Sequence, residues 1–116
     1  MRPQRSYRDY LADILQAAEE TLTFVVGMDF PTFRSDRRTN LAGVRALEII
    51  GEAARHIPAR VRRRYPQVAW QDMVAMRNKL IHEYFGVDLE VLWRTIQEDL
   101  PPLRDAVRRI LAEMEA

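Results

Sequence analysis

Apolar side chains recur at three- and four-residue steps along most of the chain, which is the spacing of one face of an α-helix. The pattern predicts four helical stretches, at about 7–26, 37–56, 70–84 and 89–114. Ser6 is the expected N-cap of the first helix, and Gly27 is expected to end it. Pro101–Pro102 is expected to interrupt the last stretch, because a proline has no N–H for the helical hydrogen bond. We therefore expect an all-α fold, an antiparallel up-and-down bundle of four or five helices.

The second predicted helix, 37–56, is apolar around most of its circumference. Its polar positions form a narrow stripe of Arg45, Glu48, Glu52, Arg55 and His56. A helix with so little polar surface is expected at the centre of a bundle or at an interface between chains. His56, at the end of this helix, is expected to be its C-terminal cap, and Pro58 ends it.

Composition narrows the class of protein. The chain has 116 residues, 47% of them hydrophobic and 30% charged, which suits one globular domain spanning 1–116. It has no cysteine and two histidines, so disulfides, thiolate catalysis and a cysteine- or histidine-rich metal site are excluded. No run approaches the roughly 18 apolar residues of a membrane span, and the N-terminus leads into no signal-peptide core. We expect a cytoplasmic protein with no membrane association, and neither a metal nor a cofactor.

The basic residues are almost all arginines: of 18, Lys79 is the only lysine. GC-rich coding is one explanation, and selection for guanidinium groups that bind phosphate bidentately is another. The net charge of +1 gives no overall attraction to nucleic acid. Four arginines nevertheless fall within the linker 59–66, and Arg62, Arg63 and Arg64 are candidate contacts to an RNA backbone. The alternative is a solvated turn.

The third predicted helix, 70–84, breaks the helical pattern at Arg77. A helix advances about 100° per residue, which places Arg77 at the centre of the apolar face. A guanidinium is costly to bury there unless it is paired or faces a polar cleft, so this position is a candidate functional site. Asn78 and His82 are four residues apart at the edge of the same face, and Tyr84 lies two turns beyond Arg77.

These side chains suit phosphoryl chemistry on RNA without a metal. Histidine can transfer the proton, arginine can stabilise charge developing on the phosphate, and the RNA supplies its 2′-hydroxyl as the nucleophile. Structural roles are the alternative. Arg77 could form an ion pair with Glu48 or Glu52, His82 could interact with the helix dipole, and Tyr84 could serve only in packing.

The segment Arg77–Tyr84 resembles the Arg-x4-His-x-Tyr motif of HEPN-domain ribonuclease toxins of the HepT type. The similarity extends over nearly the whole chain. It includes Ala46–Ala53, the Tyr65–Pro66 and Trp70 lead-in, Tyr84–Asp88 and the break at Asp99–Leu103. The short HEPN motif is common by chance, whereas the longer motif with its tyrosine and these flanks is fairly specific.

The resemblance implies a HEPN-like homodimer, with the Arg and His of both protomers lining one cleft. In this sequence, Arg77 and His82 would be catalytic, Asn78 would support them, and Glu52 would be a polar partner in the cleft. Such enzymes need no metal and leave a 2′,3′-cyclic phosphate. We expect the dimer to form through the second and third helices.

The resemblance also implies a partner. HepT-type proteins are the toxins of bacterial type VII toxin–antitoxin systems, and the antitoxin, an MntA-like nucleotidyltransferase, transfers AMP to the motif tyrosine, here Tyr84. The alternative function is a non-catalytic HEPN subunit that binds nucleotide or nucleic acid for a nucleotidyltransferase. The presence of both Arg77 and His82 favours the ribonuclease.

Overall fold

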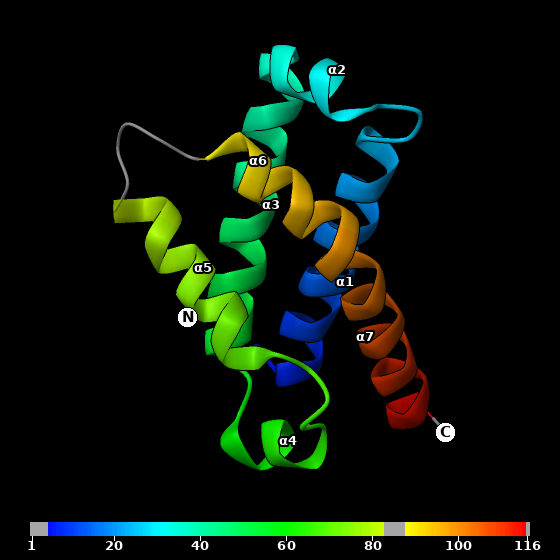
Figure 1. Cartoon of the computed structure of the whole chain (residues 1–116). Helices are drawn as coiled ribbons and strands as arrows, with labels where there is room; N and C mark the ends of the chain where they lie inside the picture. Colours follow the sequence, from blue (N-terminus) through cyan, green and yellow to red (C-terminus); the bar gives the residue numbers. More distant parts are fainter. Residues whose placement is uncertain (1–4, 83–87, 116) are drawn as a thin grey trace.

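The computed structural model describes residues 5–82 and 88–115, and for residues 77–82 it describes the helical backbone alone. All regular elements in this part of the chain are helices, and it contains no strand (Figure 1). They are α1 (Tyr7–Phe24), α2 (Phe30–Ser35), α3 (Arg37–Arg55), α4 (Ala59–Arg64), α5 (Trp70–His82), α6 (Leu89–Arg94), the π-helical segment η1 (Thr95–Asp99) and α7 (Leu100–Glu115). The predicted all-α class is confirmed.

The ends of α1 follow the predicted signals. The backbone N–H of Ser6 donates to Asp9 Oδ2 at 3.1 Å, one half of a capping box. Gly27 has a φ of +79°, in the left-handed region that glycine adopts without strain. The helix itself ends at Phe24, two residues before the predicted end, and Gly27 lies in the turn that follows.

Two short helices, α2 and α4, lie in the segments between the predicted long helices. In α2, the Asp29 carboxylate accepts a hydrogen bond from the Thr32 N–H at 2.9 Å, so the first turn is capped. The arginine-rich linker folds as α4, so its interpretation as a turn is wrong for six of its residues. Six residues span less than two turns, too few for a periodic pattern to be seen.

The predicted break at Pro101–Pro102 takes the form of a change in helix type. Leu100 N–H donates to Thr95 O, five residues back, which is the π-helical bond. The two prolines then occupy the first turn of α7, where a helix has no intrahelical partner for its N–H groups. The chain therefore stays helical from α6 through η1 into α7.

Helix α3 lies at the centre of the bundle, as its all-round apolar surface predicts. It packs against α1 and α5, and it also contacts α2 and α6 (Figure 1). Gly43 permits close approach on one side, because a Cβ there would lie 3.3 Å from Ile96 Cδ1. The largest fully buried side chains are apolar with one exception: Phe33, Leu11, Ile14, Ile50, Ile96, Leu100, Ile110, Val107 and Thr21. No helix in the described residues is long and apolar enough to cross a membrane.

Candidate active site

The helix that carries the Arg-x4-His motif is anchored at its start. Trp70 is 5% exposed, and its indole N–H donates to the Tyr65 carbonyl at 3.0 Å. From this anchor, α5 runs along α3 (Figure 1). Arg77, Asn78 and His82 all fall within this continuous helix, as predicted, but their side chains lie outside the described part of the structure. Tyr84 lies outside the described residues altogether, so the roles of these four residues stay predictions.

The described first half of α5 confirms the predicted division into two faces. Trp70 is buried, Met73 and Val74 are half-buried, and Gln71 and Asp72 are exposed. One copy of the chain therefore leaves part of the apolar face of α5 in contact with solvent. A surface of this kind can be covered by a second chain.

Glu52, the predicted polar partner, is half-buried on α3. Its Oε1 accepts a hydrogen bond from Arg55 Nη2 at 3.1 Å and lies 3.2 Å from His56 Nε2. His56 is the C-cap residue of α3, as predicted, with its backbone N–H bonded to Ala53 and Ala54. Its imidazole, however, pairs with Glu52 rather than with the helix carbonyls.

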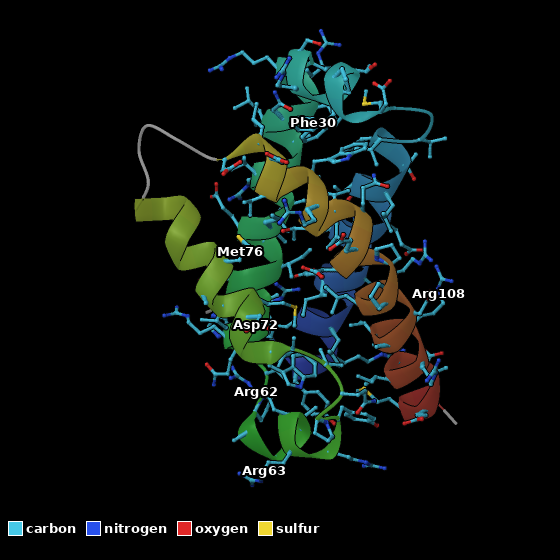
Figure 2. All side chains as sticks on the ribbon, in the orientation of Figure 1. Phe30, Arg62, Arg63, Asp72, Met76 and Arg108 are labelled. Atoms are coloured by element: carbon cyan, nitrogen blue, oxygen red, sulfur yellow. The ribbon has the colours of Figure 1, made fainter. Side chains whose placement is uncertain are left out.

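The three candidate RNA-binding arginines of α4 have different surroundings. Arg62 donates from Nε to Ile57 O at 3.0 Å and from Nη2 to Ala54 O at 2.8 Å and Arg55 O at 3.2 Å. It therefore caps the carboxyl end of α3, a structural role that the sequence did not reveal. Arg63 and Arg64 are exposed, and Figure 2 shows Arg63 on α4 at one end of the molecule.

Replacing Arg62 with alanine is expected to lower the free energy of unfolding by about 1–3 kcal/mol, because three carbonyls lose a charged donor. Arg63→Ala is the matched control and should leave stability within about 0.5 kcal/mol, since an exposed substitution has little effect. Urea denaturation monitored by circular dichroism measures both. If Arg63 contacts RNA, its loss should also reduce the salt dependence of binding by about 0.7 units of slope. Equal stability of the two variants would contradict the capping role.

A groove of about 250 Å³ separates α5 from η1 and α7, with α3 at its base. Its lining is mostly apolar and includes Met73 and Met76, together with the exposed residues Asp72 and Asp99. Figure 2 shows Met76 and Asp72 on α5. Burial raises the pKa of Asp99 above its usual range, and the nearby charges of Glu98 and Asp72 raise it further. The sequence did not predict this groove, because its walls come from three separate helical segments.

A second hollow, of about 340 Å³, lies on the outer face of α1 and α3 and contains Glu52. Its other lining residues are Arg5, Tyr10, Asp13, Arg45, Glu48, Ile49, Ala53 and His56. The polar stripe on α3 could be predicted from the sequence, whereas the contribution of α1 could not, because it depends on how the two helices pack. Among the described residues, no group of three His, Asp or Glu side chains is placed to hold a metal ion.

The all-α bundle and the position of Arg-x4-His within one helix, α5, agree with the resemblance to HEPN-type domains. Comparison of the sequence with family models identifies the family. The model described as ribonuclease HepT-like matches residues 14–110. The chain belongs to the HepT-like ribonuclease family. The matched span includes α3, α5 and the whole Arg77–Tyr84 motif, and the predicted family is confirmed.

Similar proteins agree with this assignment. Probable ribonuclease HepT of Thermococcus cleftensis is 46% identical over 107 residues, covering 92% of this chain and 97% of that protein. A relative in Methanocaldococcus jannaschii is 40% identical over 90% of this chain and 95% of its own length. Another, in Caldanaerobacter subterraneus, is 43% identical over 90% of this chain and 93% of its own length. Both have names that contain the word RNase. No solved structure matches the chain.

Proposed function

We propose that this chain is a metal-independent endoribonuclease whose catalytic groups are Arg77 and His82. The observation that carries the proposal is the family match over residues 14–110, which includes the motif on α5. The two residues lie five positions apart in one continuous helix, so a single rigid element positions both. Rigid elements hold reacting groups more precisely than loops do.

The chemistry needs no group beyond those the chain and the RNA supply. The imidazole of His82 takes the proton from the 2′-hydroxyl, whose oxygen attacks the neighbouring phosphorus. The bond from phosphorus to the 5′-oxygen breaks, and that oxygen receives a proton from an imidazolium. The products are a 2′,3′-cyclic phosphate and a 5′-hydroxyl. Arg77 stabilises the negative charge that develops on the phosphate oxygens, while Asn78 and Glu52 hold the catalytic groups in place.

A homodimer through α3 and α5 is part of the proposal. Two observations support it: Leu41 on α3 is 56% exposed, and Val74 on α5 is only half-buried. In a two-fold dimer, the Arg77 and His82 residues of both protomers would line one cleft, and the paired guanidinium groups would attract RNA phosphate.

The dimer is expected to have twice the 13.6-kDa mass of the chain at micromolar concentration. Multi-angle light scattering after gel filtration measures this mass. Leu41→Arg should weaken the dimer, because it places a charge on the proposed interface. Phe24→Arg, at a side chain 47% exposed on α1, is the matched control and should not. A wild-type chain that remains monomeric would contradict both the dimer and the shared cleft.

We also propose that the chain is the toxin of a toxin–antitoxin pair and that a nucleotidyltransferase antitoxin neutralises it by adding AMP to Tyr84. The support is the tyrosine at the end of the Arg77–Tyr84 motif together with the family match. RNA cleavage in EDTA, with end-group analysis of the products, tests the ribonuclease itself. Binding of RNA without cleavage would instead favour a non-catalytic HEPN subunit.

A further inference from the structure

The hollow on the outer face of α1 and α3 has an aromatic floor. The rings of Tyr10 and His56 stack with their centroids 4.6 Å apart and their planes at 11°. The guanidinium of Arg5 lies over the Tyr10 ring, 4.7 Å from its centroid. Tyr10 is half-buried, whereas the His56 side chain is 41% exposed. Tyr10 is therefore partly covered by the bundle, and the His56 ring next to it is partly open to solvent.

The charged side chains described around this floor are paired. Arg5 pairs with Asp13 at 2.7 Å, Arg45 pairs with Glu48 at 3.5 Å, and Glu52 lies 3.1 Å from Arg55 and 3.2 Å from His56. Among the described lining residues, the guanidinium groups do not outnumber the carboxylates, so these residues provide no excess of positive charge to hold a phosphate. It offers instead an aromatic and aliphatic surface edged by carboxylate oxygens, which accept hydrogen bonds. An uncharged planar group with N–H donors on its edge fits this combination.

An unpaired nucleobase is such a group. Bases in single-stranded RNA stack on aromatic side chains, and their edges are read by hydrogen bonds. Guanine fits best, because its N1–H and N2–H donors lie side by side and can both bind one carboxylate. Uracil fits least well, because its single N–H lies between two carbonyls that a carboxylate repels.

The hollow shares helix α3 with α5, the helix that carries the proposed catalytic residues. Glu48 and Glu52 are one turn apart on α3, the helix against which α5 packs. We propose that this hollow is a base-binding subsite in which an unpaired base near the cleaved phosphate, preferably guanine, stacks on the His56–Tyr10 pair and donates to the Glu48 carboxylate. This inference rests on the proposed ribonuclease function and adds a determinant of sequence preference to it.

The subsite can be tested by binding, so that the result does not depend on cleavage. The probes are four fluorescein-labelled 2′-O-methyl oligonucleotides, which lack the nucleophile and differ only in one central base: G, A, C or U. Fluorescence anisotropy measures the dissociation constants. We expect the G probe to bind the wild-type chain about tenfold more tightly than the U probe, because every base can stack but only the guanine edge offers two adjacent donors to a carboxylate. Equal affinities for all four probes would overturn the proposal.

Three variants locate the preference. Tyr10→Leu keeps an apolar side chain and removes the Tyr10 ring. His56→Gln keeps a polar partner for Glu52 and removes the imidazole ring. Glu48→Gln removes the carboxylate. Each is expected to reduce the preference for G over U by at least threefold. Tyr7→Leu is the matched control, because Tyr7 is also a half-buried tyrosine of α1 with an arginine, Arg60, over its ring at 5.3 Å. It lies outside the hollow and should leave the preference unchanged.

The outcomes separate the subsite from the ribonuclease. A chain that cleaves RNA but shows the same base preference in all three variants lacks the subsite and keeps the proposed function. A chain that shows the preference yet leaves RNA intact has the subsite and is not a ribonuclease. Far-ultraviolet circular dichroism confirms that each variant is folded. If Tyr10→Leu unfolds, Glu48→Gln still decides the question, because the Glu48 side chain is 31% exposed on α3 and, among the described residues, forms an ion pair with Arg45.

Discussion

Replacing His82 with alanine is expected to lower the rate of RNA cleavage by about 100- to 10,000-fold, the usual contribution of general acid–base catalysis. The imidazole is the one group of the motif that can take a proton near neutral pH. Its removal leaves the 2′-hydroxyl without a base. The measurement is cleavage of total RNA by purified chain in EDTA, with toxicity on expression as the cellular readout.

Arg77→Ala should also remove most of the activity, by about 100- to 1,000-fold, because charge on the phosphate loses its stabilising cation. It should not lower the free energy of unfolding, since it takes a guanidinium from the centre of the predicted apolar face of α5. Lys79→Ala is the control on the same helix. Lys79 lies two residues after Arg77, about 200° around the helix and away from the predicted apolar face, so activity and stability should both be retained.

Three results would contradict this mechanism. Full activity in His82→Ala would remove the proposed base from the reaction. Wild-type activity that disappears in EDTA and returns on addition of Mg²⁺ would show that a metal ion participates. Loss of activity in Lys79→Ala alone would point to a different face of α5.

The long helices could be predicted because their signals are local. Each repeats apolar positions over at least three turns, and α1 has recognisable signals near both ends, at Ser6 and Gly27. Helices α2 and α4 could not be predicted this way, because their six residues complete less than two turns. The π-helical segment before Pro101 depends on how the chain accommodates two missing N–H donors, and several solutions are compatible with the same sequence.

The candidate site shows the same difference between features that a local pattern predicts and features that depend on helix packing. Arg77, Asn78 and His82 could be assigned to one helix from their spacing, since a helix fixes which neighbours lie together. The stack of Tyr10 on His56 joins two helices that are distant in the sequence, and no local pattern predicts it. The same is true of Arg62, whose hydrogen bonds reach back across a turn to the end of α3. Contacts of this kind exist only once the helices have packed.

Regulation is expected to act through Tyr84. The hydroxyl oxygen of Tyr84 would attack the α-phosphorus of ATP on the partner nucleotidyltransferase and lose its proton, and the bond to the departing pyrophosphate would break. The AMP added in this way carries a negative phosphate and a bulky base. Because guanidinium groups bind such oxyanions strongly, the phosphate would compete with RNA for Arg77. One modification would then block the cleft by both its volume and its charge.

Tyr84→Phe should keep the aromatic ring and lose the attachment point. When the nucleotidyltransferase is co-expressed, this variant is expected to remain toxic, whereas the wild-type chain should be neutralised. Tyr7→Phe, on α1, is the control and should be neutralised like the wild type. Intact-mass spectrometry of the co-expressed wild-type chain should show added mass in steps of one AMP, and peptide mapping should assign it to the peptide that contains Tyr84. Because cleavage activity of Tyr84→Phe is measured separately, normal neutralisation of an active variant, or AMP on another peptide, would place the switch elsewhere in the chain.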